Sequence, residues 1–382
     1  MKTARNVEPL VLAAARTHAL RPNPIPSRSA AEEAGSSPVS DPHACSPARI
    51  MEVGFGFWAS KVLLTAVGLG LFTTLSGRSM TADELGDGLS LHPRGRYDFL
   101  DCLLSMGFLK REGDGPGGRY GNTAETARFL DRSQPGYVGG ILEMLNPRLF
   151  GYWNDLGTAL KTGQPQNETK HGEAPFFDTL YADPGRLEQF MSAMRGISSA
   201  NFAALAEKFD FSGFRSLCDI GGATGLLSTM VAERHAHMTC QSFDLPQVEP
   251  IARRWIERSP AAARVSTVSG DFLSDVLPRA DVITMGMILH DWNLEKKKHL
   301  VRLAYEALPS GGAFIAVENL IDDARRENTF GLLMSLNMLI EFGDAFDFTG
   351  ADFRSWCNEA GFRRYEVLHL AGSCSAAIAY KQ

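Results

Sequence analysis

The sequence predicts an α/β protein, with a parallel sheet covered by helices in its second half and a helical domain before it. Three observations predict this fold class. From residue 215 onward, short apolar segments alternate with amphipathic segments of helical spacing, as in parallel sheets whose two faces are covered. A glycine-rich turn follows the first of these apolar segments. The first half shows helical periodicity and one Gly-rich hairpin.

Composition limits the class of protein before any motif is considered. The chain has 382 residues, of which 44% are hydrophobic and 21% charged, which is enough for two domains with packed cores. Its formal net charge of −6 argues against a general binder of nucleic acid or of anionic membranes. The six cysteines are scattered, with no CxxC pair, which predicts reduced thiols and a cytoplasmic protein and gives no support to a zinc finger.

The first 75 residues contain two unusual stretches. Residues 1–46 are rich in Ala, Ser, Pro and Arg, and we expect a disordered tail because so little apolar surface cannot offset the entropy of ordering. An organelle transit peptide is the alternative, which the four acidic residues of this stretch weaken. Residues 53–75 are apolar over the length of a membrane span. Because Lys61 and four glycines interrupt this run, we prefer a helix buried at a subunit interface.

Residues 47–135 have the outline of a winged helix. Thr81, with Glu84 three residues later, has the spacing of a capping box at a helix start. A longer helix begins near Pro93, and the Gly-rich segment 110–123 is typical of a hairpin tip, with a short helix after it. A DNA-binding winged helix needs a basic recognition helix, and here acidic residues directly follow the arginines. We therefore expect no nucleic acid partner.

The remaining chain contains a helical connection and the α/β domain. Residues 136–210 show aromatic and methionine residues at helical spacing, and we expect them to shape a substrate pocket. In residues 211–382 the segments expected to be strands are 215–219, 237–244, 264–271, 280–289, 313–320 and a closing hairpin at 365–381. Ligands of such sheets lie at the carboxyl ends of the strands.

The segment CDIGGATG joins the first of these strands to a helix. Asp219 ends the strand, and Gly221, Gly222 and Gly225 form the turn. Glycines permit a sharp turn and let a ligand touch the backbone. The adjacency of Gly221 and Gly222 departs from the G-x-G-x-x-G pattern of dinucleotide sites. An acid at the strand end, just before the glycines, suits a cationic ligand better than a pyrophosphate, because like charges repel.

Acidic residues also end the next two strands. Asp244 can accept hydrogen bonds from both hydroxyls of a ribose, and Asp271 with Phe272 can bind the edge and the face of an adenine. Three acidic strand ends around one glycine turn predict an adenosine-type ligand, with acids that merely cap helices as the alternative. An adenosine ligand that also carries an ammonium and a sulfonium is S-adenosylmethionine, which we therefore expect as the cofactor.

The motifs of the second half occur together in one known family. DIGGATG, FDLPQV, SGDF, ILHDWN, LPSGGAFIAVEN, LNMLIE and AGF follow one another in order. The sequence resembles the S-adenosylmethionine-dependent O-methyltransferases that include plant caffeic acid and vertebrate acetylserotonin O-methyltransferases, over about residues 46–382. The resemblance implies a homodimer with a winged-helix dimerisation domain and a Rossmann-like methyltransferase domain whose sheet ends in an antiparallel strand. The positions that it assigns to the cofactor pocket are Asp219, Gly221, Gly222, Gly225, Asp244, Asp271 and Phe272.

A histidine follows the fourth strand of the α/β domain, next to the expected cofactor site. A neutral imidazole at His290 can take the proton of a hydroxyl group as its oxygen attacks the methyl group. The resemblance implies two acids that orient this base, at Glu318 and Asp347. Around Asp347 the chain departs from the family, because GDAFDFTGADF replaces a GGKERT-like segment and brings a shorter acid without the basic pair. Asp291 is expected to cap the following helix or to orient the loop.

The expected substrate is a small hydroxylated, aromatic methyl acceptor, with Asn337 and Met338 lining its pocket. A rival interpretation makes His290, Asp291 and Glu341 a metal site with one nitrogen and two oxygen donors, used for the C-methylation of a 2-oxo acid. A third is a winged-helix regulator that binds a metabolite without catalysis, against which the presence of His290 and the whole acidic set argues. We expect no membrane partner.

Overall fold

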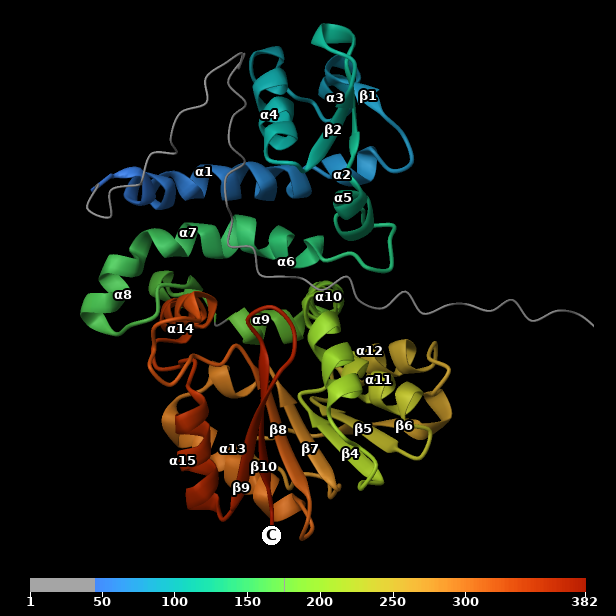
Figure 1. Cartoon of the computed structure of the whole chain (residues 1–382), viewed down its shortest axis with the longest axis vertical. Helices are drawn as coiled ribbons and strands as arrows, with labels where there is room; N and C mark the ends of the chain where they lie inside the picture. Colours follow the sequence, from blue (N-terminus) through green and yellow to red (C-terminus); the bar gives the residue numbers. More distant parts are fainter. Residues whose placement is uncertain (1–44, 175) are drawn as a thin grey trace, which may run out of the picture. The chain divides into compact units, whose positions relative to one another are not determined.

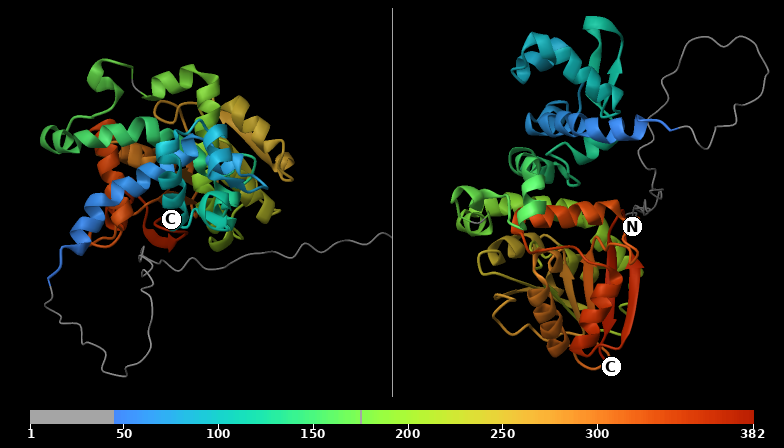
Figure 2. Two further views of the ribbon diagram at one scale, coloured as in Figure 1. Left: turned by 90° about the horizontal axis from the view of Figure 1, so that it is seen from above. Right: turned by 90° about the vertical axis from the view of Figure 1, so that its left-hand side faces the viewer.

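The computed structural model describes residues 45–174 and 176–382. The tail or transit peptide predicted at residues 1–46 lies outside this part of the chain, apart from its last two residues. The chain divides after Gly54, within its first helix, and apart from the start of that helix the fold below is that of Phe55–Gln382. Figures 1 and 2 show its elements from three directions.

The N-terminal elements are mostly helical, with a small antiparallel sheet. They are α1 (Ala48–Gly68), α2 (Leu71–Thr74), β1 (Met80–Thr81), α3 (Ala82–Gly88), α4 (Pro93–Ser105), β2 (Leu109–Glu112), η1 (Gly115–Gly117), β3 (Arg119–Asn122) and α5 (Ala124–Phe129). The strands lie in the order β1-β3-β2, and β2 with β3 forms the predicted hairpin. The Thr81 side chain accepts a hydrogen bond from the Glu84 amide, and the Glu84 carboxylate accepts one from the Thr81 amide. The predicted capping box is therefore present.

Helix α1 ends before its apolar sequence does. The sequence predicts one apolar run over 53–75, but the helix stops at Gly68 and α2 begins at Leu71. Gly70, between them, has a left-handed φ of +72°, which is a common way for a helix to end. The run therefore divides into two helices.

The apolar surface of α1 is only partly covered. Among the residues that the structure describes, α1 is the one helix with the length and composition to cross a membrane. Phe55, Phe57 and Trp58 are exposed on it. The ammonium of Lys61, the charged group inside this apolar run, donates a hydrogen bond to the side-chain oxygen of Asn146 at 2.6 Å. Its charge therefore has a polar partner within the protein. An exposed apolar face of this kind is typical of an interface helix.

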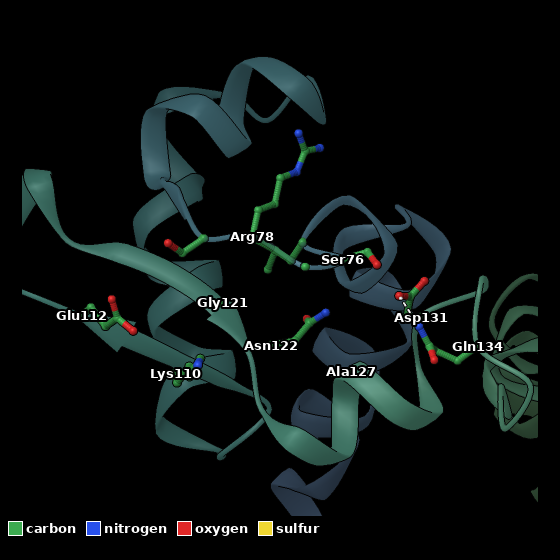
Figure 3. A pocket seen from close by; sticks show the side chains of 12 residues that line it. Ser76, Arg78, Lys110, Glu112, Gly121, Asn122, Ala127, Asp131 and Gln134 are labelled. Carbon is green, nitrogen blue, oxygen red and sulfur yellow. Dashed lines mark hydrogen bonds between the residues drawn. The ribbon is translucent and has the colours of Figure 1, made fainter. Parts of the chain in front are cut away.

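An open hollow lies beside the β2–β3 hairpin (Figure 3). Its lining contains basic, acidic and neutral polar side chains. They include Arg78, Lys110, Glu112, Asp131, Asn122 and Gln134. Its lining includes none of the residues that the sequence assigns to cofactor or substrate.

A series of helices joins this part to the large sheet. They are α6 (Gly139–Met144), the π-helical turn η2 (Leu145–Leu149), α7 (Phe150–Tyr152), η3 (Trp153–Asp155), α8 (Leu156–Thr162), η4 (Glu168–His171), α9 (Phe176–Ala182) and α10 (Pro184–Lys208). The long helix α10 begins with Pro184, and the Asp183 side chain before it accepts hydrogen bonds from two amides of the first turn. It packs against α6 and α11 (Leu226–Arg234).

The second half forms one seven-stranded sheet in the order β6-β5-β4-β7-β8-β10-β9, which can be followed in Figure 1. Its strands are β4 (Ser216–Ile220), β5 (Thr239–Asp244), β6 (Val265–Ser269), β7 (Val282–Gly286), β8 (Ala313–Glu318), β9 (Arg364–His369) and β10 (Ser375–Tyr380). Neighbouring strands are parallel from β6 through β5, β4 and β7 to β8. Strand β10 is antiparallel to both β8 and β9. The order of the strands reverses between β4 and β7, which is where ligands of open α/β sheets bind.

Alternate residues of the strands pack on opposite faces of the sheet. Leu217 and Val282 belong to a core with α10, α11 and α12 (Glu249–Ile256). Cys218 and Ile283 belong to a second core with α13 (Leu294–Ala307) and α15 (Gly350–Ala360). Helices therefore cover both faces of the sheet. One more helix, α14 (Thr329–Phe342), precedes α15 in the chain. This confirms the predicted fold class, a Rossmann-like α/β domain after a helical N-terminal domain.

Candidate active site

The turn after β4 requires its glycines. Gly221 and Gly225 have left-handed φ angles of +70° and +69°, which favour glycine. A Cβ atom at Gly221 would lie 2.4 Å from Cδ1 of Ile288, and one at Gly222 would lie 2.3 Å from Oγ of Ser242. A side chain at Gly221 or Gly222 would therefore overlap neighbouring atoms.

Two of the predicted carboxylates lie beside the turn. Asp219 is buried and accepts a hydrogen bond from the Thr284 hydroxyl at 2.6 Å. Asp244 is half-buried and accepts hydrogen bonds from the amides of Ala223 at 2.8 Å and Leu245 at 2.7 Å. Burial raises the pKa of Asp219 to about 7 and that of Asp244 to about 6. A cationic ligand that donates hydrogen bonds would favour the ionised form of both.

The third acidic strand end lies just past its strand. Strand β6 stops two residues before Asp271, earlier than predicted. Asp271 accepts a hydrogen bond from the Leu273 amide at 2.8 Å, and the Phe272 ring lies edge-on to Trp292 with 6.0 Å between centroids. A Cβ atom at Gly221 would be 3.8 Å from the Phe272 ring, so this ring stands beside the glycine turn. Carboxylates and a flat ring next to an uncovered backbone fit an S-adenosyl group.

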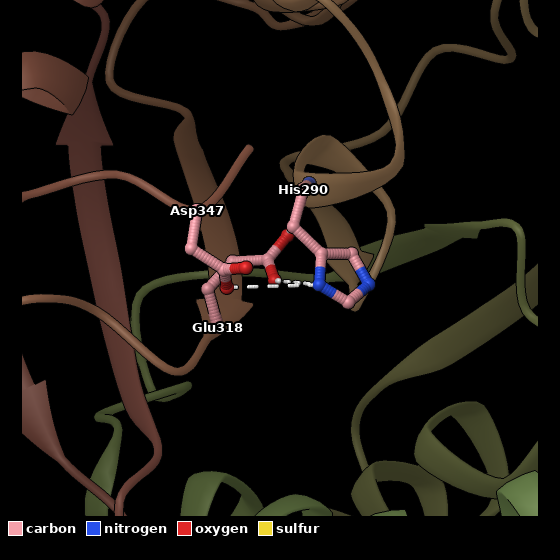
Figure 4. A group of neighbouring side chains, drawn as sticks. All are labelled: His290, Glu318 and Asp347. Carbon is pink, nitrogen blue, oxygen red and sulfur yellow. Dashed lines mark hydrogen bonds and ion pairs between the residues drawn. The ribbon is translucent and has the colours of Figure 1, made fainter. Parts of the chain in front are cut away.

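The predicted base lies on a short 3₁₀ turn, η6 (Leu289–Asp291), directly after β7. The first amide of this turn donates a hydrogen bond to Glu318 at 2.9 Å, which ties the turn to the end of β8. Nδ1 of His290 lies 3.6 Å from Asp347 and 4.0 Å from Glu318 (Figure 4). Nε2 points away from these two acids and lies 3.2 Å from Oδ1 of Asp291. The structure therefore brings the three predicted catalytic residues together.

Acidic charge dominates the surroundings of His290. Burial, the largest influence, lowers the pKa of His290, but the charges of Asp291, Glu318 and Asp347 together raise it to about 10. Burial raises the pKa of Glu318 to about 7. Nδ1 and the nearby oxygens of Glu318 and Asp347 are buried, and none has a hydrogen bond partner within the described chain. A proton on Nδ1 can therefore face the two acids, and the imidazolium form of the ring supplies the counter-charge for them.

Asp291 does not cap the next helix, so that part of its prediction is wrong. The cap of α13 is Asn293, whose side chain accepts a hydrogen bond from the Lys296 amide at 3.1 Å. The turn η6 ends at Asp291, which leaves Asn293 as the residue next to the helix. Asp291 faces Nε2 of His290 instead.

Glu341 pairs with an arginine, whereas the metal interpretation requires it to face His290 and Asp291. Its Oε2 atom lies 2.6 Å from Nη1 of Arg148 in a buried ion pair. Within the part of the chain that the structure describes, His290, Asp291 and Glu341 do not form a group whose donor atoms lie close enough to share an ion. The predicted metal trio is not brought together.

Asn337, predicted to line the acceptor pocket, is held from two sides. Its oxygen accepts a hydrogen bond from the Trp153 indole at 3.0 Å, and its amide donates one to Glu341 at 3.0 Å. The amide is thereby fixed in one orientation. Its neighbour Met338 is buried, which is compatible with core packing as well as with a pocket.

Sequence reasoning missed one half-buried and one fully buried basic residue. Arg148 pairs with Glu341 and also with Glu168. Lys297 is completely buried, and its ammonium donates a hydrogen bond to the carbonyl oxygen of Trp292. The segment EKKKHL resembles the solvated face of a helix, but Lys297 stands three residues before the buried Leu300. This spacing puts it on the apolar stripe of α13, which is a signal that the sequence did contain.

The fold and the acidic strand ends define a Rossmann-like methyltransferase that depends on S-adenosylmethionine. An O-methyltransferase domain model matches residues 153–363, and an O-methyltransferase dimerisation domain model matches residues 51–132. The chain therefore belongs to the O-methyltransferase family, and its N-terminal part is a dimerisation domain.

Individual relatives are also named as methyltransferases, one at oxygen and one at nitrogen. The chain is 36% identical over 339 residues to the tetracenomycin polyketide synthesis 8-O-methyl transferase TcmO of Streptomyces glaucescens, which corresponds to 89% of this chain and 98% of that protein. It is 34% identical over 315 residues to the N,N-dimethyltransferase OxyT of Streptomyces rimosus, over 82% of this chain and 90% of OxyT. The crystal structure of human N-acetylserotonin methyltransferase in complex with S-adenosylmethionine superposes with a TM-score of 0.81 at 27% identity, covering 89% of this chain and 99% of that one.

The glycine turn gives a first testable prediction. We expect Gly221→Ala to weaken S-adenosylmethionine binding about tenfold or more, because strain at a left-handed residue costs about 1–3 kcal/mol and the new methyl group would overlap Ile288. Gly213→Ala is the matched control, since no atom lies within 4 Å of a Cβ there. Calorimetric dissociation constants that are equal for the two variants would contradict this account of the turn.

The acids around His290 give a second prediction, on pH dependence. Asp347→Asn removes a charge that raises the pKa of His290, so the pKa of His290 falls. Catalysis by the neutral imidazole increases with pH, and the rising limb of the kcat profile should therefore move to lower pH in the variant. Its plateau should also fall, because the ring loses a positioning partner. A rising limb that stays in place or moves to higher pH would refute the proposed role of Asp347.

Proposed function

We propose that this enzyme transfers a methyl group from S-adenosylmethionine to the hydroxyl group of a small aromatic acceptor, with His290 as the general base. The observation that carries the proposal is the imidazole that follows β7 with two buried carboxylates on its Nδ1 side. Two relatives named above are described as methyltransferases of a polyketide and of N-acetylserotonin, the first explicitly at oxygen. These names support an aromatic hydroxyl as the acceptor.

In this mechanism the chain's own residues hold the base and receive the proton. Glu318 and Asp347 keep a proton on Nδ1, which leaves Nε2 to accept the proton of the acceptor hydroxyl. When bound, the cofactor would supply a methyl group on a positively charged sulfur, and the neutral thioether would leave as the acceptor oxygen bonds to the methyl carbon. The carboxylate of Asp291 lies 3.2 Å from Nε2. It has to move away from Nε2 when the acceptor hydroxyl binds there. Most of the rate enhancement then comes from holding the acceptor in line with the methyl group.

The raised pKa of His290 favours a phenol over an aliphatic alcohol. At about 10 it is close to the pKa of a phenolic hydroxyl, about 10, so proton transfer between the two is nearly balanced. A phenolate acceptor paired with a protonated His290 carries the same number of protons as a phenol paired with a neutral His290, so either pair can lead to the reaction. Aliphatic hydroxyls are far weaker acids, so the proton would stay on the hydroxyl oxygen and would not move to His290.

Further parts of the proposal concern organisation. We infer a homodimer formed through the dimerisation domain, with the exposed Phe55, Phe57 and Trp58 of α1 in the interface. We retain the domain limits 47–135, 136–210 and 211–382, with the acceptor pocket built from the second range and from the helix that carries Asn337. A cytoplasmic location is supported by the six cysteines, all of which are free thiols.

An amine is a second acceptor class, because the relative OxyT is described as an N,N-dimethyltransferase. The test is a labelled-methyl transfer screen with phenols, polycyclic aromatic hydroxyl compounds, aromatic amines and 2-oxo acids, in which product analysis identifies the methylated atom. The proposal expects label on the oxygen of an aromatic hydroxyl. Transfer to nitrogen alone, or to the carbon of a 2-oxo acid, would overturn it.

Paired substitutions separate the roles assigned to the two sides of the site. His290→Ala should reduce turnover at least a thousandfold, on the order of what general base catalysis contributes, with cofactor affinity changed only a few-fold. Asp244→Ala should instead weaken cofactor binding by about 1–3 kcal/mol, because a charged hydrogen bond acceptor is lost. Turnover and calorimetric binding are measured on both variants. The reverse pattern of effects would show that the two roles are wrongly assigned.

A further inference from the structure

The donor atoms on the Nδ1 side of His290 lie at distances that suit a bound metal ion. Nδ1 lies 3.6 Å from Oδ1 of Asp347 and 4.0 Å from Oε2 of Glu318, beyond the roughly 2.7–3.2 Å of an N–H···O hydrogen bond. Donor atoms of the three residues all lie within 4.8 Å of one another. Two ligands of one tetrahedral Zn²⁺ are about 3.3–3.4 Å apart, because each lies about 2.0–2.1 Å from the ion. A small contraction would therefore let one ion bind all three side chains.

The same atoms are buried and unpartnered. Glu318 is 1% exposed and Asp347 2%. Nδ1 of His290, Oε2 of Glu318 and both carboxylate oxygens of Asp347 have no hydrogen bond partner within residues 45–174 and 176–382. Buried polar atoms are nearly always hydrogen-bonded, so four unpartnered atoms at one place point to a ligand that they share. Four is also the usual number of ligand atoms around Zn²⁺ at protein sites.

A carboxylate on the other side of the ring supports the same conclusion. Oδ1 of Asp291 lies 3.2 Å from Nε2 of His290. A histidine that binds a metal through one ring nitrogen almost always donates its other N–H to a carboxylate, a carbonyl oxygen or water. Asp291 is placed to accept that hydrogen bond. The structure therefore offers the outer partner of a metal-binding histidine as well as its fellow ligands.

Charge and donor type indicate the class of ion. Glu318 and Asp347 carry two negative charges when both are ionised, and a divalent cation balances them without a charge on the imidazole. An imidazole nitrogen favours Zn²⁺ and similar transition ions, whereas Mg²⁺ and Ca²⁺ prefer oxygen ligands. Mg²⁺ also keeps several of its water molecules, which suits side chains this deeply buried poorly.

We propose that His290, Glu318 and Asp347 form an inhibitory site for a divalent transition metal ion such as Zn²⁺. A neutral imidazole carries one ring proton. When Nδ1 binds the ion, this proton is on Nε2, and Nε2 cannot accept the proton of an acceptor hydroxyl. Metal binding and methyl transfer therefore exclude each other. The inhibition rests on the function proposed above for His290, whereas the metal site itself does not.

Calorimetry with ZnCl₂ alone tests the site, on the full chain freed of metal with a chelator. Asp347→Asn and Glu318→Gln each remove one charged ligand and nearly keep the shape of the side chain. Asp344→Asn is the matched control, because Asp344 is an exposed acid on the same segment, where it accepts a hydrogen bond from Asn293 at 2.9 Å. Two ligand substitutions are compared so that one remains if the other does not fold.

Absorption spectra with Co²⁺ in place of Zn²⁺ identify the ligands. Their visible bands report the number of ligands, and a thiolate ligand adds a charge-transfer band in the near ultraviolet. This control is needed because the six cysteines are free thiols, and thiolates also bind Zn²⁺.

The wild type and Asp344→Asn should each bind one Zn²⁺, with the Co²⁺ spectrum of a four-coordinate site without thiolate. Asp347→Asn and Glu318→Gln should bind it about a hundredfold more weakly, since loss of even an outer partner of a metal ligand costs about 10–100-fold. Equal affinity in all four proteins, binding that involves a thiolate, or no saturable binding by the wild type would overturn the proposal.

Inhibition is measured with an acceptor from the transfer screen. Saturating Zn²⁺ should abolish methyl transfer by the wild type, and a chelator should restore it, while the calorimetric affinity for S-adenosylmethionine changes only a few-fold. Full activity of the metal-loaded enzyme would refute the inhibition. If the screen finds no acceptor, the proposed function and the inhibition that rests on it both fail, whereas the metal site is decided by calorimetry alone.

Discussion

Carboxyl groups that are wholly or partly removed from water at the carboxyl edge of the sheet are the constraint on which the site depends. Asp219 and Asp244 lie on one side of the strand-order reversal, and Glu318 and Asp347 lie on the other. An ionised carboxylate removed from water costs several kcal/mol unless a cation or hydrogen bond donors compensate it. The first pair suits a cofactor that carries positive charge on sulfur and nitrogen. The second pair suits an imidazole that can gain a proton during the reaction.

The two pairs divide the chemistry between them. On the cofactor side the glycine turn leaves the backbone uncovered, and a carboxylate at the end of each strand can fix a polar group of the ligand. On the base side Glu318 at the end of β8 and Asp347 in the segment between α14 and α15 face one nitrogen of His290, and the other nitrogen is directed away from them. Parallel strands deliver their last residues to one edge, so a single sheet edge can hold both a donor and a base.

Much of this arrangement could be predicted from the sequence, because the signals are local. The capping box at Thr81, the glycine turn and the apolar strands around Asp219 each depend on a few neighbouring residues. The end of β6 was harder to predict. This strand lies at the edge of the sheet and is only partly buried, so its apolar pattern is weak and Asp271 falls beyond it.

The rest of the site depends on contacts that no local pattern encodes. The sequence allows Glu341 to be a metal ligand, because its partner Arg148 lies 193 residues away in the chain. Lys297 carried a usable signal in its position on an apolar stripe, but its neighbours Lys296 and Lys298 hid that signal among solvated charges. The acids that face it come from elements on both sides of α13 in sequence. Tertiary packing alone brings them together.

Proton release on cofactor binding tests the central claim most directly. Asp219 and Asp244 have raised pKa values, about 7 and about 6, without a cofactor, and a bound cation should lower both. Calorimetry of S-adenosylmethionine binding at pH 6 in buffers of different ionisation enthalpy measures the protons exchanged. The account predicts net release of protons, and less release above pH 8, where both carboxylates are already ionised. Binding at pH 6 without proton release, or with proton uptake, would contradict it.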